Sequence, residues 1–299
     1  MQRLEPWHGH CQLTFQRSGD HTRHQGGCSA PFKMLRAEKG ENGRCELPLL
    51  HTAGGLVGGD QLSIELTLEP NSRGLVTSVA AQKIYGSVGR SQLEPRGRWA
   101  CQHVRCHLDK QSDLEWLPQE LVVFADGLYE QHFMVQLHAD ASFLGTEIVR
   151  LGRTASGESL QQGQWRSNLS IQRCNRNNGR PEDWELVDRI ELGGDAVNDL
   201  HGLNGKPVFG SLVWAAPMNL EESRISNLLS DVRSDREGLS GTMSCSALHQ
   251  GLVARYVGTS SRDARFWFSR IWARTRALRK LQAPRIPRVW PLQEAPLQR

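Results

Sequence analysis

The residues best placed to do chemistry in this sequence are carboxylates, and the first of them follows a run of glycines. Gly54, Gly55, Gly58 and Gly59 fall within six positions, and Asp60 comes directly after them. Doubled glycines predict sharp chain reversals, because glycine adopts positive φ without steric cost. The stretch therefore presents backbone and one negative charge at a tight loop, and we predict that Asp60 is a functional position.

Further acids lie inside or beside apolar segments, namely Glu120, Asp126, Glu147 and Glu158. A carboxylate buried without a partner is costly, so such acids are paired or line a polar space. One interpretation is that each caps a turn or pairs with a nearby arginine, such as Arg150 or Arg153. The other is that they and Asp60 line a polar passage for a divalent cation, with uncharged lining from Gln82, Ser87 and Ser156. Carboxylate and water ligands exchange such ions readily.

Softer metal donors form two short clusters, His8/His10/Cys11 and Cys101/Cys106/His107. Imidazole and thiolate suit nickel, zinc or copper. Neither cluster has the spacing of a closed structural zinc site. In a strand, Cys101 and His103 would share one face while Cys106 faces the other. We therefore expect no permanently bound metal, and the alternative for these residues is buried cysteine beside exposed histidine.

Enzyme motifs are absent from the sequence, which has no phosphate-binding loop, dinucleotide fingerprint or nucleophile elbow. An all-β hydrolase using His51 and Asp60 is the competing interpretation. A third interpretation is a nucleic-acid binder, because residues 262–299 hold ten Lys/Arg and only two acids. This segment has a net charge of +8, and since the whole chain has +4, the remaining residues sum to −4. The basic segment has no nucleic-acid motif, so a protein partner is the better expectation.

The composition sets the class of protein. A chain of 299 residues is long enough to bury a substantial core. No apolar run approaches the ~20 residues of a membrane span, and the N-terminus has no signal-peptide pattern. We expect a cytoplasmic protein whose seven cysteines are reduced thiols.

Residues 47–169 show many short apolar–polar alternations, which predict strands. Turn residues lie between them, and the pattern is typical of an all-β sandwich, barrel or stacked-coil architecture. The residues alone do not choose among these three. The polar stretch 173–183 is predicted to be a hairpin tip.

Two helices are predicted near the C-terminus. The first would begin with a capping box at Asn219 to Glu222, and the second with Ser260 to Asp263, ending near Leu281 before Pro284. Residues 284–299 read as an extended proline-rich tail. The second helix carries Phe266, Phe268 and Trp272. Positions 266 and 268 do not share a narrow helical stripe, so we predict that these aromatic residues include an anchor for a protein partner; the alternative is that they are core.

Several blocks occur in the order of a known family, at residues 51–62, 81–87, 114–126, 151–158, 207–210 and 252–258. Together they resemble the urease accessory proteins called UreD, or UreH in some bacteria. The resemblance implies one UreD-like domain over residues 1–299, with a mainly β, irregular stacked β-solenoid or β-helix-like body and two α-helices near the C-terminus. It also implies a non-catalytic metallochaperone scaffold that binds apo-urease. With UreF and the GTPase UreG, such a protein would pass Ni²⁺ into the urease active site, with no cofactor bound permanently and no nucleic-acid or membrane partner.

Overall fold

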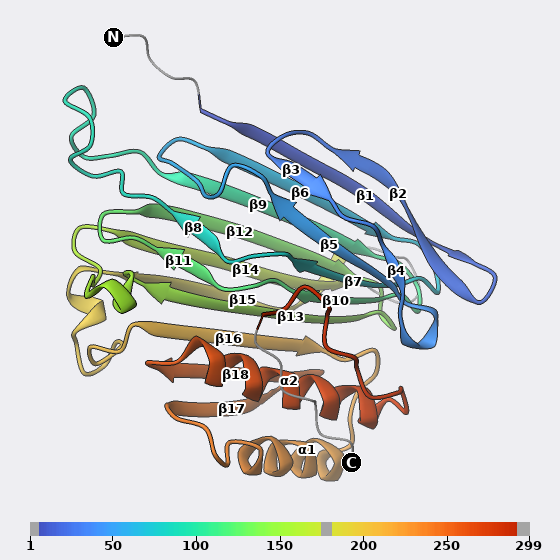
Figure 1. Cartoon of the computed structure of the whole chain (residues 1–299). Coiled ribbons are helices and arrows are strands. Elements are labelled where there is room, and N and C mark those ends of the chain that lie inside the picture. Colours follow the sequence, from blue (N-terminus) through green and yellow to red (C-terminus); the bar gives the residue numbers. More distant parts are fainter. Residues whose placement is uncertain (1–5, 175–180, 292–299) are drawn as a thin grey trace.

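The computed structural model describes residues 6–174 and 181–291, which form two facing β-sheets and two helices (Figure 1). Sheet A has the strand order β15-β14-β12-β9-β6-β1-β2. Its strands are β1 (His8–Ser18), β2 (His21–Cys28), β6 (Gln61–Leu68), β9 (Ala100–Leu108), β12 (Leu128–Leu137), β14 (Gln164–Cys174) and β15 (Pro181–Gly193).

Sheet B has the order β17-β18-β16-β13-β10-β7-β5-β3, with three short strands attached beside this path. The main strands are β3 (Phe32–Met34), β5 (Cys45–His51), β7 (Arg73–Ser78), β10 (Asp113–Leu117), β13 (Ser142–Leu151), β16 (Val208–Ala215), β17 (Thr242–Leu248) and β18 (Gly251–Gly258). The short strands are β4 (Glu38–Lys39), β8 (Gln82–Ile84) and β11 (Leu121–Val123), and short 3₁₀ turns lie at Glu41–Gly43, Thr154–Ser156 and Gly194–Val197.

The middle of the chain alternates between the two sheets. From β6 to β14, successive long strands belong alternately to sheet A and to sheet B. Within each sheet, these long strands pair with their neighbours in parallel. Antiparallel strands flank these parallel blocks, at β2 and β15 in sheet A and at β16 to β18 in sheet B. The predicted mainly β class with two helices near the C-terminus is confirmed. A β-helix is not established, because the two sheets remain open.

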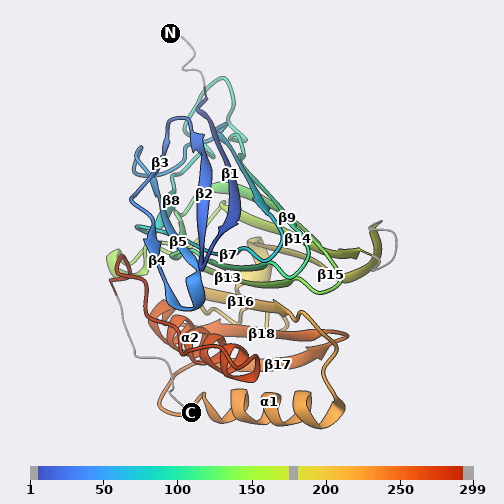
Figure 2. The same cartoon turned by 90° about the vertical axis from the view of Figure 1, so that its right-hand side faces the viewer.

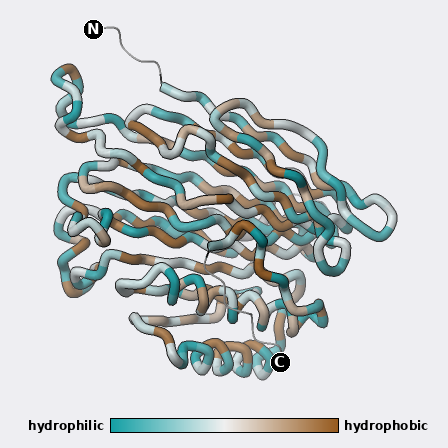
Figure 3. The backbone as a smooth tube through the Cα atoms, viewed as in Figure 1, coloured by the Kyte–Doolittle hydropathy of each residue, from teal (hydrophilic) through white to brown (hydrophobic). Residues whose placement is uncertain are grey.

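Apolar residues fill two layers. Strand β16 is buried on both faces, because Phe209 and Val213 point between the sheets while Leu212 and Trp214 point toward the helices. Side chains alternate in direction along a strand, so one strand can serve both cores. Figure 3 shows hydrophobic segments along the strands of both sheets. Sheet B is therefore the central layer, between sheet A and the helices (Figures 1 and 2).

The helices are α1 (Glu222–Ser234) and α2 (Ser261–Leu278). The predicted cap of α2 is confirmed, because the Ser260 side chain accepts a hydrogen bond of 3.1 Å from the Asp263 backbone nitrogen. Helix α2 ends three residues before Leu281, and Lys280 takes a left-handed φ of 57° just beyond it. The cap predicted for α1 at Asn219 is wrong, because the helix begins after Glu221, whose side chain makes no capping bond.

The described part of the predicted tail packs against sheet B. Trp290 is buried beside Trp272, with ring centroids 6.3 Å apart, and its Nε1 donates a hydrogen bond of 2.9 Å to Thr77. Residues 292–299 lie outside the described ranges, as do residues 175–180 of the predicted hairpin tip, which antiparallel β14 and β15 flank. Neither described helix combines the length and the hydropathy that crossing a membrane requires.

A network of buried charges joins α2 to sheet B. Glu115 accepts hydrogen bonds from Arg44 and, at 2.9 Å, from Arg276, and all three residues are almost fully buried. Arg279 binds both carboxylate oxygens of Asp113, at 3.0 and 2.7 Å. Much of the basic C-terminal charge thus neutralises acids of the protein itself, which weakens the interpretation as a nucleic-acid surface.

Candidate functional site: a polar cavity between the sheets

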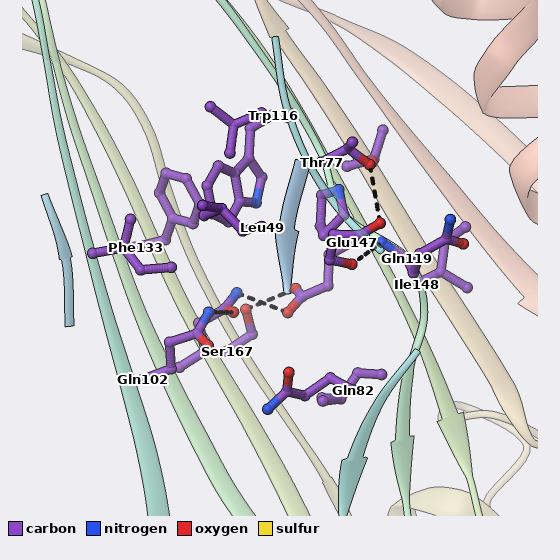
Figure 4. Close-up of a pocket in the computed structure, with 18 of the residues that line it drawn as sticks. Leu49, Thr77, Gln82, Gln102, Trp116, Gln119, Phe133, Glu147, Ile148 and Ser167 are labelled. Atoms are coloured by element: carbon purple, nitrogen blue, oxygen red, sulfur yellow. Dashed lines mark hydrogen bonds between the residues drawn. The ribbon is translucent and has the colours of Figure 1, made fainter. Parts of the chain in front are cut away.

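A cavity of about 110 Å³ lies between sheets A and B. This volume is well above the roughly 10–15 Å³ that one water molecule needs. Figure 4 shows Trp116, Leu49 and Phe133 gathered at one side of the cavity, with Gln82 and Ser167 away from them. The lining is mixed, because polar side chains such as Glu147, Gln82 and Ser167 lie among a larger apolar surface, and water in the cavity would bind to these polar groups.

Glu147 supplies a carboxylate to this cavity. Strand β13 alternates in direction, so Phe143 and Val149 lie with Glu147 on the face toward sheet A. One oxygen of Glu147 accepts from Gln131 Nε2 and the other from Ser167 Oγ, each at 2.9 Å. Burial raises the pKa of Glu147 to about 7, against the lowering effects of the Ser167 hydrogen bond and the Arg255 charge. The side chain is therefore poised to exchange a proton near neutral pH.

Three further side chains bring unpaired nitrogens to the cavity lining. Both ring nitrogens of His51, and the amide nitrogens of Gln82 and Gln119, are buried without a hydrogen-bond partner among the described residues. Burial lowers the pKa of His51, although the nearby Asp60 charge opposes this, so the ring is neutral at pH 7. Buried polar groups of this kind bind water or a ligand.

An ion pair spans the edge of the cavity. Arg255 on β18 donates to Ser211 on β16 and to Asp188 on β15, the outermost strand of sheet A. Ser211 and Asp188 both line the cavity. Arg255 therefore ties sheet B to the free edge of sheet A and adds positive charge near Glu147.

The raised pKa of Glu147 gives a testable pH dependence. Its folded pKa of about 7 exceeds the ordinary 4.5, so the folded state holds an extra proton between these values. Stability contributed by the protonated carboxyl is then lost as pH rises from about 4.5 through 7. We expect Glu147→Gln to remove this loss and to be more stable than the parent at pH 8, by up to about 3 kcal/mol. Urea unfolding of both proteins at pH 5 and pH 8 checks this; an equal difference at the two pH values would contradict it.

The glycine-rich loop holds Asp60 away from the cavity lining. Asp60 accepts hydrogen bonds of 2.9 Å from the backbone nitrogens of Trp7 and Val57. Gly59 has a left-handed φ of 102°, and a Cβ on Gly58 would lie 2.2 Å from Ser87 Oγ. The Ser87 hydroxyl in turn donates a hydrogen bond to the Arg98 carbonyl and accepts one from the Arg98 backbone nitrogen. These residues brace loops, and the described chain shows no hydrogen bond between His51 and Asp60.

The other predicted acids pair locally. Glu120 lies 2.5 Å from Arg265 on α2, and Glu158 pairs with Arg153 and accepts from the Ala125 backbone at 2.9 Å. Asp126 lies 3.9 Å from Arg90. The backbone carbonyl of Asp126 accepts a hydrogen bond from the Ser87 nitrogen, so the loops that carry these two residues meet at one end of the sheets. Ser156 is exposed at the same end, on its 3₁₀ turn. Of the residues predicted to line a passage, the structure brings Glu147 and Gln82 to the cavity.

Comparison with known proteins identifies the chain. The family model described as UreD urease accessory protein matches residues 8–291. A urease accessory protein UreD of Synechococcus sp. (strain WH7805) is 70% identical over 99% of this chain and 95% of its own length. Those of Parasynechococcus marenigrum (strain WH8102) and Prochlorococcus marinus (strain MIT 9303) are 68% and 57% identical, covering 99% and 97% of this chain and 94% and 98% of their own.

The chain belongs to the UreD family. The resemblance noted in its sequence is thereby confirmed.

In this UreD chain the aromatic residues predicted to bind a partner differ in exposure. Phe268 and Trp272 are buried in the core between sheet B and the helices. Phe266 is half-buried, and the Arg262 guanidinium lies 5.8 Å from its ring centroid. Phe266 is thus the one of the three that lies at the surface.

The two soft-donor clusters of this UreD chain split across strand faces. His8 and His10 are exposed while Cys11 is buried, and His103 and His107 are exposed while Cys106 is buried. Within the described ranges, no group of three or more His, Cys, Asp or Glu side chains converges as a metal centre. All seven cysteines are described and free, including Cys11 and Cys28, which face each other across β1 and β2.

Sequence reasoning missed several residues of the UreD cavity. Gln131, Ser167, Asp188 and Arg255 each occupy an inward position on a strand whose neighbouring inward positions are apolar. On β14, for example, Ser167 lies between Trp165 and Leu169 on the same face. A polar residue at one position of a period-two apolar pattern is the signal that could have found them.

Proposed function

We propose that this chain is a non-catalytic metallochaperone scaffold that binds apo-urease in the cytoplasm and, with UreF and the GTPase UreG, promotes nickel incorporation. The observation that carries the proposal is the match of residues 8–291 to the urease accessory protein family. Relatives that cover nearly the whole chain have the same name. Nickel is the cargo in this scheme, and nucleotide hydrolysis belongs to the partner.

The cavity supports a role in passing the ion along. Its lining offers the Glu147 carboxylate, neutral His51 and the amide and hydroxyl groups of Gln82, Gln131 and Ser167. Oxygen donors with water hold a divalent cation weakly and exchange it fast. A carboxyl with a pKa of about 7 releases its proton when a cation arrives and regains it when the cation leaves. We therefore propose that nickel travels hydrated through this space and is never held permanently.

The proposed contact with UreF centres on the surface of α2. Phe266 with Arg262 beside it offers an apolar ring and a cation at the surface, a combination typical of interface anchors. Phe268 and Trp272 would act indirectly, by fixing the helix on sheet B.

The competing hydrolase interpretation is weakened by the geometry of His51. Both carboxylate oxygens of Asp60 accept hydrogen bonds from backbone nitrogens. The His51 ring has no hydrogen-bond partner within the described chain that would activate it as a base. Co-purification separates the two functions. We expect the tagged protein to retain urease subunits and to hydrolyse no member of a broad ester, amide and phosphoester panel. Turnover that Asp60→Asn abolishes, with no urease retained, would establish the hydrolase instead.

A further inference from the structure

Two histidines stack on the outer face of sheet A, the face that lies away from the cavity. Parallel strands β9 and β12 place His103 directly beside His132 in register. Their rings lie 4.8 Å apart between centroids and only 5° from parallel. His103 is exposed and the His132 side chain is 43% exposed, so an ion in solution has access to both.

A carboxylate orients one of these rings. His132 Nε2 lies 3.1 Å from Glu130 Oε1, and that oxygen also accepts a hydrogen bond of 3.2 Å from Asn168 Nδ2. A carboxylate at this distance favours the tautomer with its proton on Nε2, which leaves the Nδ1 lone pair for a metal. Metal-binding histidines have this kind of support from their second nitrogen.

The two rings stand side by side on neighbouring strands, which places both imidazoles within reach of one ion. Two nitrogens bound side by side to one ion at 2.0–2.1 Å are roughly 3 Å apart. Binding therefore requires the rings to rotate out of the stacked arrangement, so that the lone pairs in their planes converge on the ion.

We propose that His103 and His132 form an open, exchangeable binding site for a transition-metal ion on the outer face of sheet A. The two imidazoles bind the ion, Glu130 and Asn168 orient His132, and water completes the coordination. Imidazole donors select nickel, zinc or copper over magnesium or calcium. Within the described residues no group of three or more His, Cys, Asp or Glu side chains is placed to hold a metal ion, so this site has only two protein ligands. Such a site suits capture and release more than storage.

A matched variant is available for the test. His107 is exposed on the same face of β9, but its neighbours in register are Thr67 and Gln136, so it has no imidazole partner. Untagged protein, its His103→Gln/His132→Gln double variant and the His107→Gln control are titrated with NiCl₂, and separately with MgCl₂, by calorimetry at pH 7.5. Circular dichroism checks that each variant is folded, and His132→Gln alone serves if the double variant is not.

We expect the double variant to lose one nickel equivalent per chain or to bind it at least tenfold more weakly, while His107→Gln binds as the parent does. In the parent, paramagnetic Ni²⁺ should broaden the His103 and His132 ring signals before those of other histidines. Magnesium should give no heat at this site. Any of three results would overturn the proposal. The parent and the double variant could bind nickel equally, the His107→Gln control could lose as much nickel binding as the double variant, or the parent could bind no nickel.

Discussion

Replacing Ser167 by leucine is expected to lower urease activation at least tenfold while the accessory complex still assembles. Ser167 is 4% exposed, lines the cavity and donates to Glu147. Leucine would occupy space that water and a cation need, and the existing cavity accommodates the added bulk without forcing the strands apart. Urease activity in cells that carry the variant, with co-purification of urease and UreF, measures both parts of the expectation.

Two controls separate filling of the cavity from other effects. Ser167→Ala removes the same hydrogen bond but adds no bulk, so activation should stay within about threefold of the parent. Ser170→Leu makes the same substitution on the same strand, but Ser170 bonds Arg189 on the outer face. If Ser170→Leu or Ser167→Ala impairs activation as strongly as Ser167→Leu, the loss does not come from closing the cavity.

Glu115→Gln is expected to destabilise the protein by about 3–5 kcal/mol. Glu115 is 1% exposed and neutralises two buried cations, Arg44 and Arg276. The substitution keeps the volume but leaves the guanidinium of Arg276 buried without its carboxylate. A buried charge that loses its partner costs far more than the pair contributes, so α2 should loosen from sheet B.

Urea unfolding followed by circular dichroism measures this effect. The control is Glu191→Gln, the same substitution at a side chain that is 56% exposed and pairs with Arg166 across β14 and β15. We expect the control to cost no more than about 1 kcal/mol. Similar unfolding midpoints for the two variants would show that the buried network does not anchor the helix.

Local features of the sequence were enough to predict the class of fold. Period-two alternation identified the strands, and Ser260 three residues before Asp263 identified the start of α2, because both signals act over a few residues. The prediction failed for the start of α1, where Asn219 and Glu222 have the capping spacing but the helix begins after Glu221. Tertiary packing decides where a short helix begins, and no local pattern records it.

The site depended on contacts that local patterns do not contain. Glu120 and Glu147 each directly precede an apolar residue, yet of the two only Glu147 lies on a long strand whose alternation directs it between the sheets. Glu120 lies between strands and meets Arg265, which is 145 positions away along the chain. Which acid faces the cavity is therefore set by strand pairing, and strand pairing could not be read from one sequence.

The most direct test of the central proposal is the nickel content of urease purified from cells that lack this protein. The account predicts that urease is made and assembled but holds almost no nickel, and that returning the parent chain restores it. Metal analysis of the purified enzyme, with nickel supplied at the same concentration throughout, gives the ratio of nickel to active sites. Urease fully loaded with nickel in the absence of this chain would contradict the proposed function.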